Sequence, residues 1–112
     1  MTETWQTVNE EVLASAPGTS FGSFEPQKHK FANLCFEEIL DDLQQIERLI
    51  LFINPEIKFI YTVSPVPLTA TAESEHILVA NNFSKALLRA AVGTHVKSSR
   101  KAHYFPSFEL IT

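Results

Sequence analysis

Several residues whose side chains could take part in chemistry lie at the end of, or after, one short apolar run, residues 57–64. The run ends in Ser64, and Pro65 and Pro67 follow it at once. Prolines lack a backbone N–H donor and hold the preceding residue extended, so the run predicts a strand that ends at this serine. In open α/β sheets, ligands bind at the carboxyl ends of the strands. Ser64 could therefore face a ligand; alternatively, its hydroxyl only hydrogen-bonds backbone at the strand end.

A polar stripe on the next segment, residues 76–97, could face the same crevice. Its members recur at three- and four-residue steps, which places them on one helix face: Asn81, Ser84, Lys85 and Arg89. A solvated face is the simpler interpretation, and a wall above the strand end is the functional one. His76 begins the segment and could reach the same rim, but a lone histidine is more often a surface or capping residue.

The segment Gly18-Thr19-Ser20-Phe21-Gly22 matches the G-x-S-x-G pattern of a nucleophile elbow. Such an elbow needs a strand before it and a helix after it. Pro17 precedes the pattern and Pro26 follows it, which is a poor context for both elements. We therefore interpret the match as a turn within a surface loop over residues 17–30.

Metal, redox and cofactor chemistry find little support. The histidines lack the sequence spacing that is typical of metal ligands. They are His29, His76, His95 and His103. Cys35 is the single cysteine, so the chain can form neither an intramolecular disulfide nor a cysteine cage. We interpret Cys35 as a small core side chain, and we expect no metal and no cofactor.

Composition excludes further classes of function. A net charge of −4 over 112 residues leaves no basic footprint for nucleic acid. The sequence has no run of about 18 apolar residues, so it predicts no membrane span. Residues 1–20 lack the basic start and apolar core of a secretory signal, which makes a cytoplasmic location our expectation.

Four elements must position the candidate residues. Apolar side chains at helical spacing, with carboxylates and amides between them, predict a helix over residues 33–54 that begins at an Asn33 N-cap. A strand over 57–64, a helix over 76–97 and a second strand over 102–111 follow. This helix-strand-helix-strand order predicts an α/β fold with parallel pairing. Doubly wound sheets usually carry about five strands, so we expect this sheet to be incomplete.

Three spaced motifs resemble the GSCFA family: T-V-S-P-V-P-L-T-A-T at 62–71, A-N-N-F-S-K-A-L-L-R at 80–89 and Y-F-P-S-F-E-L-I at 104–111. M-T-E-T-W at 1–5 also resembles the end of that family's L-G-L-T-E-x-W segment. This bacterial family is similar to the SGNH or GDSL serine hydrolases and acyl transferases. The resemblance therefore implies an SGNH-like, flavodoxin-like parallel sheet.

The resemblance also implies candidate rim residues and a deficit. The positions that match the motifs, without assigned roles, are Glu3, Trp5, Ser64, Thr71, His76, Asn81, Ser84, Lys85 and Arg89. The family's G-S-C-F-A motif, which holds the presumed nucleophile, does not occur in the sequence. An SGNH enzyme would carry its base in a C-terminal portion that this sequence does not show. Residues 1–112 are thus expected to be the central part of a GSCFA domain.

Two functions remain open at this stage. The intact family member would be a hydrolase or acyl transferase acting on an ester or an acylated sugar, and this chain alone would be inactive. The alternative is a non-catalytic module from a truncated or split gene. Such a module would self-associate or complement a partner chain through the uncovered parts of its incomplete sheet.

Overall fold

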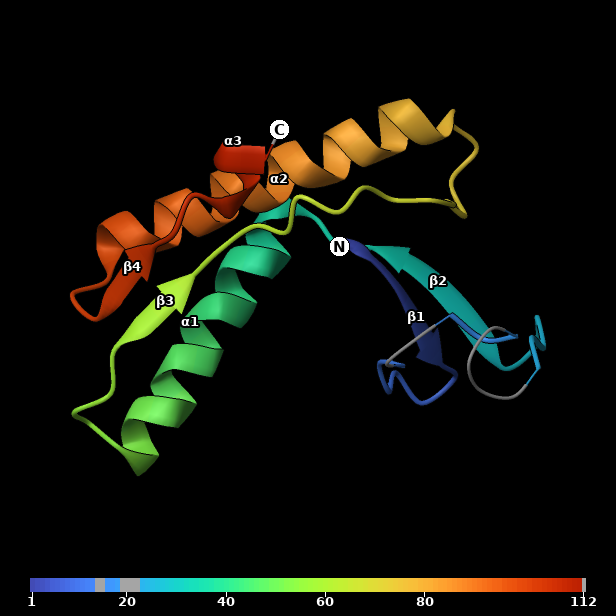
Figure 1. Cartoon of the computed structure of the whole chain (residues 1–112). Coiled ribbons are helices and arrows are strands. Elements are labelled where there is room, and N and C mark those ends of the chain that lie inside the picture. Colours follow the sequence, from blue (N-terminus) through green and yellow to red (C-terminus); the bar gives the residue numbers. More distant parts are fainter. Residues whose placement is uncertain (14–15, 19–22, 112) are drawn as a thin grey trace.

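The protein is described here by a computed structural model, which covers residues 1–13, 16–18 and 23–111. Within these residues the elements run in the order β1 (Glu3–Thr7), β2 (His29–Asn33), α1 (Phe36–Ile53), β3 (Phe59–Tyr61), α2 (Ile77–Ser98), β4 (Ala102–Tyr104) and α3 (Ser107–Ile111) (Figure 1). The predicted α/β class is confirmed, with one parallel and one antiparallel pair of strands.

The parallel pair joins β3 to β4, and α2 is the crossover between them. Phe59 lies opposite Ala102, and Tyr61 lies opposite Tyr104. The pairing extends beyond the strands, because the Phe105 N–H donates to the Tyr61 carbonyl at 2.8 Å. The strand-helix-strand order of the sequence therefore led to the observed arrangement.

Only one face of this parallel pair is covered. Phe59 and Tyr61 stack with ring centroids 6.0 Å apart, and the Tyr61 ring meets the edge of His95 from α2. Ile60 lies between them in the chain, so its side chain points to the opposite face. It is 75% exposed, and its cross-strand partner His103 is exposed too.

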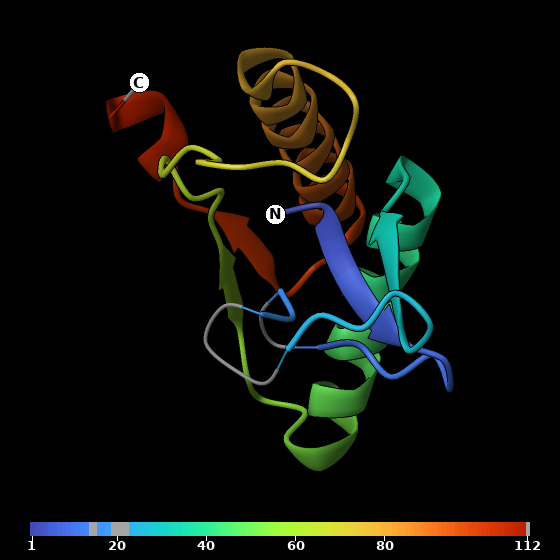
Figure 2. The same ribbon diagram turned by 90° about the vertical axis from the view of Figure 1, so that its right-hand side faces the viewer.

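The antiparallel pair, β1 with β2, was not predicted from the sequence. Trp5 lies directly opposite Phe31, with ring centroids 5.4 Å apart, and such aromatic cross-strand pairs stabilise a ladder. The pair lies apart from β3 and β4 in Figure 1. Figure 2 shows the start of β1 between α2 and the loop after β3. The predicted loop over 17–30 is wrong at its end, because His29 and Lys30 belong to β2.

The predicted second strand over 102–111 is wrong beyond Tyr104. Ser107–Ile111 form the short helix α3, in which the Leu110 N–H donates to the Pro106 carbonyl at 3.0 Å. Proline fits the start of a helix because its φ angle is already helical. The Ser107 hydroxyl donates to the Val63 carbonyl at 3.1 Å and so anchors α3 to the end of β3.

The start of α1 also differs from the prediction. Asn33 pairs with Glu3 in the β1–β2 ladder, and Cys35 is the N-cap of the helix. The Glu38 carboxylate accepts from the Cys35 N–H at 3.1 Å, half of a capping box. Cys35 is exposed, so its interpretation as a core side chain is wrong. The remaining differences are ends: α1 stops at Ile53, and β3 covers only Phe59–Tyr61 of residues 57–64.

The molecule is open for its length. Its radius of gyration is 15.6 Å, whereas a compact domain of this length has about 13 Å. Its accessible surface is 7909 Å², against about 6,200 Å² for a folded monomer of this mass. No helix among the described residues has both the length and the apolar character to cross a bilayer.

Candidate functional site

A crevice of about 590 Å³ opens at the C-terminal end of β3. One wall is the loop after the strand, including Ser64, Leu68 and Thr69, and the other wall is α2 with Lys85 and Leu88. The two prolines of the loop prevent further strand pairing, so the chain leaves the sheet here and turns over α2. This is the place at which open α/β sheets position ligand sites.

Lys85 carries the charged side chain of this crevice, and Met1, whose N-terminal ammonium it repels, also lines it. Lys85 is only 4% exposed, and its ammonium donates to the Ser64 carbonyl at 2.6 Å. Burial lowers the pKa of the Lys85 ammonium, because removal from water disfavours the charged form. Among the ion pairs of the described residues, none joins Lys85 to a carboxylate.

Asn81 and Ser84 extend the same face of α2. The Asn81 side-chain oxygen accepts from the Leu68 N–H at 2.7 Å and holds the loop against the helix. The buried Ser84 hydroxyl accepts from the N–H and the hydroxyl of Thr2, at 3.2 and 3.0 Å. Asn81, Ser84 and Lys85 therefore face the loop after β3 or Thr2, the residue before β1. The interpretation of the polar stripe as a solvated face is wrong for these three residues.

The Ser64 hydroxyl is hydrogen-bonded to the nearby backbone. Its hydroxyl oxygen accepts from the Val66 N–H at 3.1 Å, a local turn typical of serine. Among the described residues, no histidine or carboxylate hydrogen-bonds to this hydroxyl. This geometry matches the structural alternative that the sequence left open, a hydroxyl that caps a strand end.

Glu3, Trp5 and Thr71 line a second cavity of about 500 Å³, which shares Leu68 and Ala70 with the first. The Glu3 carboxylate accepts from the Thr71 hydroxyl at 2.6 Å and from the Ala72 N–H at 3.1 Å. Trp5 lies against Phe24 and Phe31. The two cavities are thus neighbours around Leu68, and Met1 lines both of them.

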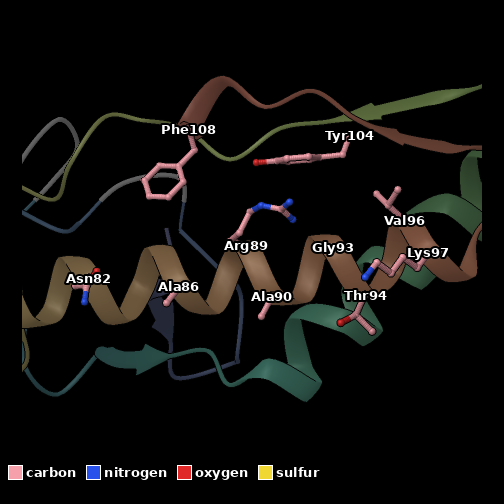
Figure 3. Close-up of a pocket in the computed structure, with 10 residues that line it drawn as sticks. All are labelled: Asn82, Ala86, Arg89, Ala90, Gly93, Thr94, Val96, Lys97, Tyr104 and Phe108. Atoms are coloured by element: carbon pink, nitrogen blue, oxygen red, sulfur yellow. The ribbon is translucent and has the colours of Figure 1, made fainter. Parts of the chain in front are cut away.

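His76 and Arg89 lie elsewhere. The His76 ring accepts from the Leu78 N–H at 3.1 Å, so it caps α2, the alternative that the sequence left open. Arg89 borders a separate groove of about 670 Å³ between α2 and α3 (Figure 3). Its guanidinium lies 4.0 Å from the centre of the Tyr104 ring, and its Nε donates to Glu109 at 2.5 Å.

Comparison with models of protein families matches residues 1–112 to the GSCFA family. The chain belongs to the GSCFA family. The resemblance found in the motifs is thereby confirmed, and the match covers the whole chain. No curated protein and no solved structure matches it.

This GSCFA chain contains a second buried polar cluster, which sequence reasoning missed. Glu47 of α1 is 7% exposed, and its carboxylate accepts from His95, from Ser99 and, at 3.3 Å, from the Tyr61 hydroxyl. Burial opposes ionisation, but the hydrogen bonds from Ser99 and His95 outweigh it and lower the pKa of the Glu47 carboxyl. Burial and the Glu47 charge raise the pKa of Tyr61 to about 12.

The spacing of α1 contains the signal for this cluster. Glu47 stands four residues after Leu43 and three before Ile50, so it continues the apolar stripe. Ile46 and Leu49 are instead exposed. The arrangement is not a catalytic triad, because Ser99 and His95 both bond to the carboxylate and not to each other. It joins α1 to α2 and β3.

The described residues show no group of three or more histidine, cysteine or acidic side chains that could hold a metal ion.

The G-x-S-x-G match falls on residues 18–22, and 19–22 lie outside the described residues. The crevice after β3 offers a buried ammonium, hydroxyl groups and apolar walls. Such a combination can bind and orient a ligand.

Proposed function

We propose that this chain supplies one wall of an SGNH-like acyl-transfer site. The intact GSCFA protein would then be an ester hydrolase or acyl transferase, with an ester or an acylated sugar as its substrate. The observation that carries this proposal is the position of Lys85, which reaches from α2 to the Ser64 carbonyl and borders a crevice at the carboxyl end of β3. Asn81 of the same helix holds the loop of this crevice in place at Leu68.

The chain alone is expected to be inactive. Covalent acyl transfer needs a nucleophile, an adjacent base and an oxyanion hole together. The hydroxyls of Ser64 and Ser84 accept from Val66 and Thr2, and neither contacts a described histidine. The G-S-C-F-A motif does not occur in the sequence. We propose that a segment outside residues 1–112 provides the nucleophile.

Hydrolysis of p-nitrophenyl acetate by the purified chain tests the first part of this proposal. The expected result is no turnover above the buffer rate. Robust turnover that is lost in Ser64→Ala or Ser20→Ala would contradict it. The mass of the protein in its source cells tests the second part. A species near 12.6 kDa would contradict the proposed additional segment, and a much larger one is expected.

A second candidate function is a non-catalytic module that complements a partner chain or a second copy of itself. Uncovered apolar side chains on two elements favour it, since Phe52 of α1 is 89% exposed and Ile60 of β3 is 75% exposed. Soluble monomers rarely expose contiguous apolar surface without a binding role. Sedimentation velocity of the purified chain tests this candidate, which predicts a dimer or larger species.

A further inference from the structure

We propose that the crevice after β3 binds the anionic group of a small ligand, a carboxylate or a phosphate, through the ammonium of Lys85. This inference names a ligand class for the site under the proposed function, and it rests on that crevice being a ligand site. It does not require that the chain catalyse a reaction. Binding and turnover can therefore succeed or fail separately.

The burial of Lys85 carries the argument. A charged side chain that is almost fully buried is costly unless it is paired or hydrogen-bonded. An ammonium has three N–H donors, and the described part of the chain gives it one acceptor, the Ser64 carbonyl at 2.6 Å. None of the carboxylates in the described ion pairs belongs to this site. The ammonium is thus a positive charge with donors to spare.

The surroundings of the ammonium would strengthen an ion pair. Leu68, Leu88 and Val92 line the same crevice, and apolar walls lower the local dielectric, so that opposite charges attract more strongly than in water. Thr69 also lines the crevice, and its hydroxyl can donate to an anion. A ligand with an anionic head and a short apolar body would satisfy both features.

Glu3 is the carboxylate among the candidate residues, and it does not pair with the Lys85 ammonium. Glu3 borders the neighbouring cavity, where it accepts from the Thr71 hydroxyl and the Ala72 N–H. Glu3 therefore stabilises the loop after residue 70 and leaves Lys85 without a carboxylate. The competing explanation is that Lys85 only holds the Ser64 carbonyl in place, and the experiment below separates the two.

Titration of the purified chain with acetate and, separately, with inorganic phosphate tests the proposal by NMR. The backbone amides of Leu68 and Thr69 should shift saturably, and the anion should raise the measured pKa of Lys85. A response to acetate alone indicates a carboxylate ligand, and a response to phosphate alone indicates a phosphate ligand. Lys85→Met should abolish the shifts, whereas Lys97→Met, on the exposed side of α2, should leave them unchanged.

The proposal is overturned if neither anion shifts the amides. It is also overturned if the pKa of Lys85 is unchanged at saturating anion. Equal binding by Lys85→Met would overturn it as well. If Lys85→Met does not fold, the pKa measurement on the wild-type chain still decides, because it needs no variant. Anion binding by the chain would support this inference even if the native protein had a mass near 12.6 kDa, which would contradict the proposed acyl-transfer function.

Discussion

At the residue scale, two buried polar side chains have different surroundings. Glu47 accepts from three partners, Tyr61 of β3 and His95 and Ser99 at the end of α2, so its charge is well compensated. Lys85 donates to one carbonyl. A compensated buried charge stabilises the native arrangement, whereas an uncompensated one is typical of functional sites.

We expect Glu47→Gln to destabilise the fold by about 1–3 kcal/mol at about pH 7, because buried donors lose a charged acceptor. The native pKa of Glu47 lies below its ordinary value of 4.5. Its contribution is therefore complete above that value and is lost as the pH falls through the lower native pKa. Urea unfolding across this range should show the variant and the wild type converging in acid.

The matched control is Glu37→Gln, since Glu37 is exposed in the first turn of the same helix. It should change stability by no more than about 0.5 kcal/mol at either pH. A constant difference between wild type and Glu47→Gln from neutral to acidic pH would contradict the role assigned to the Glu47 charge.

Asn81 and Asn82 form a natural pair for a second test. The Asn81 oxygen accepts from the buried Leu68 at 2.7 Å, whereas Asn82 is exposed. Asn81→Ala should cost about 1 kcal/mol and increase amide hydrogen exchange at Leu68. Asn82→Ala should do neither. Equal exchange at Leu68 in both variants would show that the loop does not depend on this contact.

At the element scale, α2 organises the molecule. One face holds the loop after β3 through Asn81 and Lys85, and His95 on another face meets Glu47 of α1. Arg89 on a third face meets Glu109 of α3. The rest of the surface of α2, which includes Val79, Ala86 and Ala90, is exposed. The polar stripe seen in the sequence therefore splits into residues that serve different partners.

Gly93 tests how the Arg89 side chain packs against its own helix, α2. A Cβ at this position would lie 2.8 Å from Nη1 of Arg89, so alanine requires the guanidinium to move. Alanine in a helix interior is favoured over glycine by about 1 kcal/mol. We expect Gly93→Ala to gain less than this in the wild type and the full amount in an Arg89→Ala background.

A double-mutant cycle by urea unfolding measures the difference between the two backgrounds. Equal gains in both backgrounds would mean that Arg89 does not pack against this part of α2. Gly93 and Arg89 both line the groove in Figure 3, so a displaced guanidinium would change the shape of that groove.

At the scale of the whole molecule, the uncovered apolar surface is the dominant feature. The face of β3 that carries Ile60 and the outer side of α1 near Phe52 are both exposed. Their burial would contribute about 25 cal/mol for each Å² removed from water. The open shape and the large accessible surface follow from the same incomplete cover.

We expect the wild-type chain to bind an apolar fluorescent dye and to self-associate. The double variant Phe52→Ser, Ile60→Thr should reduce both effects and change stability little, because these side chains have few neighbours to lose. Sedimentation velocity and dye fluorescence measure this, with Val79→Ser on exposed α2 surface as the control. A wild-type monomer with a cooperative melt and no dye binding would contradict the expectation.

What the sequence determined by itself was local. The periodicity between Phe36 and Ile53 specified α1, Asn54-Pro55 ended it, and the strand-helix-strand order implied the parallel pairing of β3 with β4. Helix period, proline geometry and crossover rules depend on residues near one another in the chain. The motifs identified the family for a similar reason, since each is a short continuous string.

Only the tertiary structure decided which polar residues meet. Glu47 and His95 are 48 residues apart, and Ser84 meets Thr2 across 82. No local pattern encodes such contacts, because they depend on how helices and strands pack together. The pairing of β1 with β2 was missed for the same reason. The helix at Ser107–Ile111 has a local signal, the proline at its start, which the prediction of a strand overlooked. Long-range packing, not residue type, placed Lys85 in a crevice and Arg89 outside it.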